Sequence, residues 1–318
     1  MLRKIVFLDR GTIPPHVTFP SLGVGYEWKD YNYTQEAELI SRLKDAAVCV
    51  VNKINLREQT LSQLPALKMI ALTATGSNNI DLAYCKKRGI AVSNIVNYGT
   101  PSIAEHVFAL ILALKRNLLT YREAAFTQWS KGVFFTILHY PITELHGSVL
   151  GVIGKGTLGR AVGALGSAFG MKVLYSERKQ TKIPRAGYTA FPTVLKEADI
   201  LTLHTPLVKE TQSLIGEQEL QLMKSSAILI NTARGGIVDE KALVAALHAK
   251  TIAGAGIDVT IPEPPHETNV LLSLKEMPNV ILTPHIAWGG ENSLRQVSIQ
   301  VVENISAFFA GTSKRRLV

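Results

Sequence analysis

Short apolar runs alternate with amphipathic segments along this 318-residue chain. In the N-terminal third, four runs are apolar enough to form strands that are buried on both faces of a parallel sheet. They span residues 4–9, 47–52, 69–75 and 91–95, and helical segments lie between them at 35–46, 57–64 and 79–89. This alternation predicts a parallel α/β domain of about 100 residues.

A second set of alternating segments begins at residue 148 with the run SVLGVIG. Its six strand-like runs span residues 148–154, 172–177, 199–205, 227–233, 252–259 and 280–286. Helical sequences such as 158–170 and 240–250 separate them. Six strands that start at a glycine-rich turn predict a Rossmann sheet, the doubly wound α/β fold that binds dinucleotides.

Two longer helical segments flank this second set. The segment 102–125 precedes it and carries an apolar stripe formed by Ile103, Val107, Leu110, Ile111 and Leu114. The segment 291–311 follows the last strand of the second sheet. Because that sheet is then complete, we expect this final helix to return to the first domain.

The composition, 47% hydrophobic and 19% charged residues, is typical of a soluble globular protein. The longest apolar run, 107–114, ends at Lys115 and falls short of the ~20 residues that a membrane span needs. The N-terminus reads as a first strand and not as a signal peptide. Cys49 and Cys85 lie in apolar surroundings without CxxC spacing, which predicts buried free thiols in the cytoplasm and indicates neither a disulfide nor a metal site.

The formal net charge of +9 raises the question of nucleic-acid binding. The basic residues are mostly single and scattered, and the one tight cluster is SKRRLV at residues 313–318. This pattern argues against a nucleic-acid partner. A basic surface also attracts small anionic substrates and phosphates.

The sequence GKGTLG places Gly154, Gly156 and Gly159 between a predicted strand and a predicted helix. Such glycines allow a tight turn and let the backbone approach a pyrophosphate at the helix N-terminus. Glu177 ends the next strand and could accept hydrogen bonds from the adenosine ribose, which predicts NAD as the cofactor. Arg178 and Lys179 follow directly, so a 2′-phosphate, and hence NADP, stays open, as does a glycine turn without a ligand.

Four polar side chains lie at or beyond the ends of three successive strands of the second set. Arg234 follows the strand at 227–233, Asp258 and Glu263 follow the next, and His285 lies at the end of the last. Ligands bind outside the carboxyl ends of the strands in open α/β sheets. Each residue alone has a structural explanation, such as a surface ion pair or a core histidine, but together they predict a site at the nicotinamide.

At these residues the sequence resembles the D-isomer-specific 2-hydroxyacid dehydrogenase family. YGTPSIAEHVFALILALKRNL, INTARGGIVDE and TPHIAW are most similar to its glycerate dehydrogenase (hydroxypyruvate reductase) branch. The resemblance implies an NAD-binding Rossmann domain at residues 102–287, inserted into a flavodoxin-like substrate domain formed by 1–101 and 288–318. It also implies a homodimer.

The resemblance implies roles for the strand-end residues. Arg234 would bind the carboxylate and carbonyl of the substrate, and His285 would be the general acid/base. Glu263 would orient that imidazole and stabilise its protonated form, and Asp258 would lie near the nicotinamide carboxamide. Further cofactor contacts are implied for Thr157, Leu158, Thr205, Pro206, Thr232 and Ala233. On the substrate domain, the backbone amides of Thr75 and Gly76 and the cation of Lys53 would face the substrate.

Together with the residues, the resemblance implies an NAD(H)-dependent enzyme that interconverts a small D-2-hydroxy acid and its 2-oxo acid. D-glycerate with hydroxypyruvate is the expected pair, and glyoxylate is a further expected substrate. An NADP-dependent glyoxylate reductase of the same fold is one alternative. Another is a non-enzymatic NAD-sensing scaffold like the C-terminal-binding corepressors, because fold alone does not establish catalysis.

Overall fold

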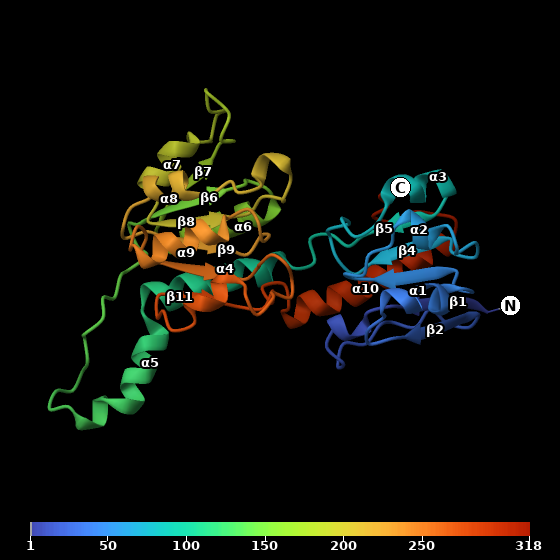
Figure 1. The fold of residues 1–318 in the computed structure, drawn as a ribbon, viewed down its shortest axis with the longest axis horizontal. Coiled ribbons are helices and arrows are strands. Elements are labelled where there is room, and N and C mark those ends of the chain that lie inside the picture. Colours follow the sequence, from blue (N-terminus) through green and yellow to red (C-terminus); the bar gives the residue numbers. More distant parts are fainter. Residues whose placement is uncertain (1) are drawn as a thin grey trace. The chain divides into compact units, whose positions relative to one another are not determined.

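The computed structural model describes residues 2–318, which form two compact units. The first unit comprises the chain up to residue 99 together with 289–318, and the second comprises 100–288. These limits lie within two residues of the domain boundaries expected from the sequence. Each unit has its own parallel sheet with helices on both faces (Figure 1).

The first unit contains a five-stranded parallel sheet in the order β2-β1-β3-β4-β5. Its strands are β1 (Arg3–Phe7), β2 (Tyr26–Asp30), β3 (Val48–Val51), β4 (Met69–Leu72) and β5 (Ala91–Ser93). Every residue of β3 and β4 is buried, which explains their continuous apolar sequence. The order is that of flavodoxin-like sheets. The edge strand β2 has the sequence YEWKD. Its polar and apolar residues are mixed, so the apolar pattern of the sequence did not predict a strand there.

Helices cover both faces of this first sheet. They are η1 (Arg10–Thr12), η2 (Glu36–Glu38), α1 (Leu39–Leu43), α2 (Glu58–Leu61), α3 (Leu82–Arg88) and α10 (Glu291–Phe309). The final helix, α10, packs against β4, and its Asn304 side chain donates a hydrogen bond to the Asn94 carbonyl at 2.8 Å. The prediction of buried free thiols at Cys49 and Cys85 is confirmed, and burial raises the pKa of Cys85 to about 11.

The second unit contains a six-stranded parallel sheet in the order β11-β10-β9-β8-β6-β7. Its strands are β6 (Val149–Ile153), β7 (Lys172–Ser176), β8 (Ile200–Leu203), β9 (Ile228–Asn231), β10 (Gly254–Ile257) and β11 (Val280–Leu282). Successive residues of β9 enter two different hydrophobic clusters, because the faces of a strand alternate. The order reverses at β6, between β7 and β8, and such a switch point is where open α/β sheets bind ligands.

The second unit contains two helices where the sequence predicts one long helical segment. The helices of this unit are α4 (Thr100–Lys115), α5 (Leu118–Thr127), η3 (Trp129–Lys131), α6 (Thr157–Ala168), α7 (Phe191–Glu197), η4 (Lys209–Thr211), α8 (Glu217–Leu222), α9 (Glu240–His248) and η5 (Val270–Leu274). The prediction of one continuous helical segment over 102–125 is wrong, because Asn117 adopts a left-handed conformation with φ of 49° and ends it. The side chain of Asn117 donates a hydrogen bond to the Pro141 carbonyl at 2.6 Å.

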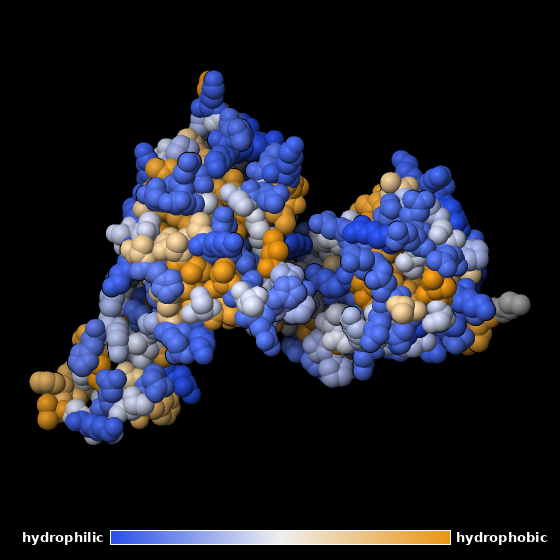
Figure 2. Space-filling view, viewed as in Figure 1, coloured by the Kyte–Doolittle hydropathy of each residue, from blue (hydrophilic) through white to orange (hydrophobic). Residues whose placement is uncertain are grey.

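Residues 118–140 form an arm that extends away from the sheet of the second unit, and α5 runs along this arm toward its end (Figure 1). The end of this arm is rich in hydrophobic side chains (Figure 2). Val133, Phe134 and Phe135 are 92%, 76% and 90% exposed. Within residues 2–318, no helix has the length and apolar character that crossing a membrane requires.

Candidate active site

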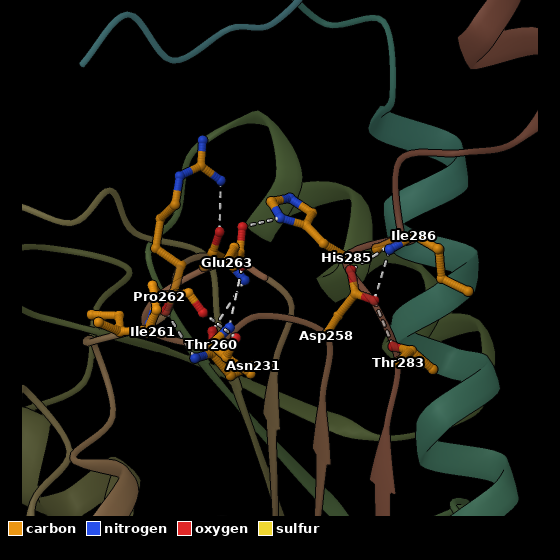
Figure 3. A network of polar contacts seen from close by, with 12 residues as sticks. Asn231, Asp258, Thr260, Ile261, Pro262, Glu263, Thr283, His285 and Ile286 are labelled. Atoms are coloured by element: carbon orange, nitrogen blue, oxygen red, sulfur yellow. Dashed lines mark hydrogen bonds and ion pairs between the residues drawn. The ribbon is translucent and has the colours of Figure 1, made fainter. Parts of the chain in front are cut away.

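Side chains from three neighbouring strands meet at the carboxyl edge of the second sheet. Strands β9, β10 and β11 are adjacent and parallel, so their carboxyl ends lie at the same edge. Arg234 follows β9, Asp258 and Glu263 follow β10, and His285 follows β11. Figure 3 shows the polar network that connects these loops.

His285 and Glu263 form the central contact of this network. The Nδ1 atom of His285 lies 2.6 Å from Oε2 of Glu263, and the Thr260 amide donates to Oε1 of the same carboxylate at 3.2 Å (Figure 3). An ionised carboxylate only accepts hydrogen bonds, so Nδ1 carries the proton in this pair. Nε2 is then the ring nitrogen that can exchange a proton with a substrate. The imidazole is 25% exposed, which makes it accessible.

Asp258 holds the turn that carries His285. Its Oδ1 accepts hydrogen bonds from the Thr283 hydroxyl and the Ile286 amide, and its Oδ2 accepts one from the Ala287 amide at 2.9 Å. The Asp258 side chain is completely buried. Its contact with a nicotinamide carboxamide stays a prediction. In the structure, this carboxylate fixes the backbone after His285 and the Thr283 side chain before it.

Helix α4 supports the same turn through two side chains that the sequence analysis did not single out. Ser102 donates a hydrogen bond to the Ala287 carbonyl at 2.7 Å. The Nε2 atom of His106 lies 3.2 Å from the Thr283 hydroxyl and 3.7 Å from Oδ1 of Asp258. Ser102 and His106 are four residues apart and therefore share one helix face. The spacing of these two polar residues was the available signal for a functional helix face. Nothing in the sequence showed that this face of α4 packs against β11.

Arg234 presents an exposed guanidinium at the end of β9. The Asn231 side chain shapes the preceding turn, because its amide donates to the Arg234 carbonyl at 3.0 Å and its oxygen accepts from the Ala233 amide at 3.1 Å. The Nη1 atom of Arg234 donates to the Ala233 carbonyl at 2.6 Å. The other guanidinium donors suit the carboxylate and carbonyl of a small acid.

The glycine turn at the switch point fits a dinucleotide. A Cβ on Gly154, where φ is +101°, would lie 2.4 Å from the His204 carbonyl oxygen, and a Cβ on Gly159 would lie 1.8 Å from the Gly154 oxygen. Gly156 faces open space and caps α6, and no side chain caps that helix. The amides of Thr157 and Leu158 therefore belong to an open N-terminus of a twelve-residue helix, the kind of site that binds phosphates.

Other predicted cofactor residues follow β8 and β9. Thr205 and Pro206 come after His204, whose pKa burial lowers to about 4, so this imidazole is neutral at physiological pH. Thr232 and Ala233 come directly after β9. The Thr232 hydroxyl is buried and has no hydrogen-bond partner among the described residues, which is consistent with a partner on the cofactor.

Glu177 follows β7, but its carboxylate is fully engaged. Oε1 accepts from the Arg178 amide at 2.9 Å and from Nη2 of Arg185 at 2.7 Å. Oε2 accepts from the amide of Arg185 at 3.1 Å and from its Nε at 2.7 Å. The hydrogen bonds from the Arg185 side chain lower the pKa of Glu177 to about 2. Sequence reasoning missed Arg185, because it lies eight residues away in a loop.

The predicted substrate residues of the first unit lie beyond the carboxyl ends of its strands. Lys53 follows β3, and Thr75 and Gly76 follow β4. The buried carboxylate of Asp9 accepts hydrogen bonds from the amides of Asn52 and Lys53, at 2.9 Å and 2.7 Å. The Thr75 hydroxyl donates to the Ile95 carbonyl at 2.8 Å. Asp9 is a further residue that the sequence analysis missed.

The fold and the site define a nicotinamide-dependent α/β oxidoreductase, and comparison with known proteins specifies its family. The family model described as "D-isomer specific 2-hydroxyacid dehydrogenase, NAD binding domain" matches residues 108–287. The chain is 42% identical to a glycerate dehydrogenase of Methylorubrum extorquens, with 98% of each chain covered. It is 39% identical to a glyoxylate reductase of Thermococcus litoralis, over 92% of this chain and 89% of the relative.

Solved structures agree with these relatives. The D-lactate dehydrogenase of Aquifex aeolicus, complexed with NAD and lactic acid, superposes with a TM-score of 0.80 at 34% identity, with 96% of each chain covered. An NADPH-dependent glyoxylate/hydroxypyruvate reductase of Sinorhizobium meliloti gives a TM-score of 0.82 at 27% identity, over 100% of this chain and 97% of that one. The chain belongs to the D-isomer-specific 2-hydroxyacid dehydrogenases. It is an oxidoreductase that uses a nicotinamide dinucleotide and a small hydroxy or oxo acid.

Proposed function

We propose that this protein interconverts D-glycerate and hydroxypyruvate, also reduces glyoxylate, and uses NAD(H). The observation that carries the reaction type is the 2.6 Å contact between Glu263 and His285 on the sheet edge that also bears Arg234. The glycerate dehydrogenase and glyoxylate reductase relatives support the choice of substrate class.

Arg234, His285 and Glu263 each have a distinct role in the proposed reduction. The Arg234 guanidinium binds the carboxylate and carbonyl of the 2-oxo acid and stabilises the negative charge that develops on the carbonyl oxygen. Protonated His285 donates its Nε2 proton to that oxygen. Glu263 holds the ring through Nδ1 and stabilises the imidazolium form. The bound nicotinamide supplies the hydride.

In the first unit, we propose that the amides of Thr75 and Gly76 receive the substrate carboxylate and that Lys53 adds a positive charge. The hydrogen bonds that the Asn52 and Lys53 amides donate to Asp9 support this assignment, because they fix the backbone of the loop after β3. A fixed loop can bind a small acid with little loss of conformational entropy.

We also propose a homodimer that forms through the arm at residues 118–140. Exposed aromatic side chains at Phe126, Trp129, Phe134 and Phe135 support this proposal. Contiguous exposed apolar patches of this kind mark protein interaction sites on water-soluble domains.

A substrate screen tests the proposed function. Reduction of hydroxypyruvate, glyoxylate and pyruvate is followed at 340 nm with NADH and with NADPH. We expect the highest kcat/KM for hydroxypyruvate and measurable reduction of glyoxylate. A higher kcat/KM for pyruvate would contradict the substrate assignment, and NADH binding without turnover of any 2-oxo acid would favour the scaffold alternative.

A further inference from the structure

The adenosine end of the dinucleotide site carries an arginine that reverses the expected effect of Glu177. In this fold, a carboxylate at the end of β7 selects NAD by hydrogen-bonding the ribose 2′-hydroxyl, and a nearby arginine accommodates the 2′-phosphate of NADP. Glu177 has that position, but its side chain is only 1% exposed and its two oxygens accept four hydrogen bonds. Ribose hydroxyls would have to displace Arg185 to reach it.

Arg185 is held by contacts on more than one side. Its Nε and Nη2 atoms form a bidentate pair with Glu177, and its guanidinium lies 4.3 Å from the centre of the Tyr188 ring. The side chain remains 59% exposed. Because the pair cancels the charge of Glu177 and the guanidinium stays accessible, the carboxylate is not free to repel a phosphate.

Further cations surround this pair. Lys155, in the glycine turn, lies 4.9 Å from the centre of the same Tyr188 ring and donates to the Gly187 carbonyl at 3.1 Å. Arg178 is exposed next to Glu177. Lys179, by contrast, pairs with Glu219 at 2.8 Å. Lys155, Arg178 and Arg185 thus bring three positive charges to this corner, and Glu177 brings one negative charge.

We propose that Arg185 is the residue that admits a 2′-phosphate, so that this enzyme uses NADPH as well as NADH. Glu177 acts mainly by fixing the guanidinium. Glu177 alone would favour NADH over NADPH. With Arg185 in place this preference becomes small, because the 2′-phosphate of NADPH, with a charge of about −1.5 to −2, meets an excess of positive charge. The inference rests on the dinucleotide site and does not depend on which oxo acid is reduced.

Binding of cofactor fragments tests the proposal without catalysis. Calorimetry compares 2′,5′-ADP, which carries the 2′-phosphate, with 5′-AMP, which lacks it. The wild-type protein should bind 2′,5′-ADP at least as tightly as 5′-AMP. Arg185→Ala should weaken 2′,5′-ADP by about tenfold or more and change 5′-AMP by less than about threefold. Lys182→Ala, an exposed cation in the same loop, is the matched control and should change neither.

A second variant covers the case in which Arg185→Ala disturbs the loop. Glu177→Gln removes a negative charge that Arg185 already cancels, so 2′,5′-ADP should bind within about threefold of wild type, and a gain of about tenfold or more would show that Glu177 repels the 2′-phosphate. Wild-type binding that favours 5′-AMP by about a hundredfold, or an unchanged fragment ratio in Arg185→Ala, would overturn the proposal. Fragment binding as expected with no oxo-acid turnover would contradict only the proposed function.

Discussion

At the scale of single residues, the backbone at His285 adopts a φ of 55°, a region that non-glycine residues seldom occupy. Asp258 stabilises this conformation through amides on the far side of the turn. The positions of Arg234, Glu263 and His285 could be predicted because each follows a strand end. The support from Asp258 could not, because its partners at residues 286 and 287 are backbone groups that leave no mark in the sequence.

The pairing of Glu263 with His285 predicts that the carboxylate contributes to the rate of reduction. Glu263→Gln keeps the size of the side chain but removes the negative charge that holds the imidazole through Nδ1, so kcat/KM for hydroxypyruvate should fall by about tenfold or more. NADH binding should not change. Assays at 340 nm for wild type, Glu263→Gln and the exposed control Glu267→Gln measure the loss. A Glu263→Gln enzyme within about threefold of wild type would leave Glu263 as a loop residue.

The ion pair of Glu177 predicts an acid-dependent contribution to stability. Its pKa is lowered to about 2 in the folded protein and is about 4.3 in an unfolded chain. The stabilisation is therefore complete above about pH 5 and is lost as the pH falls toward 2. Urea unfolding should show a stability difference between wild type and Glu177→Gln at pH 7 that narrows at pH 3. Glu197→Gln, which removes the exposed pair with Lys172, should have little effect at either pH.

At the scale of elements, the order of strands and helices could be predicted from the apolar pattern. Two features could not: the edge strand β2 and the break between α4 and α5. The edge strand β2 lacks an apolar run because its five residues are exposed or only half-buried at the edge of the sheet. The break between α4 and α5 depends on the side chain of Asn117 reaching the Pro141 carbonyl. That contact joins residues 24 positions apart, so the helical periodicity around Asn117 does not indicate the break and predicts one continuous helix.

The glycine turn yields a matched pair of substitutions. In Gly159→Ala the new Cβ would lie 1.8 Å from the Gly154 oxygen, so unfolding should require at least about 2 kcal/mol less free energy. In Gly156→Ala the Cβ meets nothing within 4 Å, so stability should stay within about 0.5 kcal/mol. NADH should nevertheless bind about tenfold more weakly, because the backbone can no longer approach the pyrophosphate closely. Urea unfolding measures the stability of both variants, and fluorescence titration measures their NADH binding. A Gly159→Ala protein as stable as wild type would contradict the packing argument.

At the scale of the whole molecule, the exposed arm predicts association. Light scattering at micromolar concentration should give the mass of a dimer for the wild-type chain. Replacing Phe134 and Phe135 by Ser removes two side chains that are 76% and 90% exposed, and should shift the protein toward monomer. Ile183→Ser, at an equally exposed site outside the arm, is the control and should remain a dimer. A monomeric wild-type protein would contradict the proposed homodimer.

The central claim is that His285 performs the proton transfer of a 2-oxo-acid reductase, and one comparison of variants tests it most directly. NADH oxidation with hydroxypyruvate is measured at 340 nm for wild type, His285→Ala and His266→Ala, whose histidine is exposed in the loop after Glu263. The account predicts that His285→Ala loses at least about a hundredfold in kcat/KM, because general acid catalysis contributes that much. NADH binding should be unchanged in His285→Ala, and His266→Ala should retain full activity. A His285→Ala enzyme within about threefold of wild type would contradict the account.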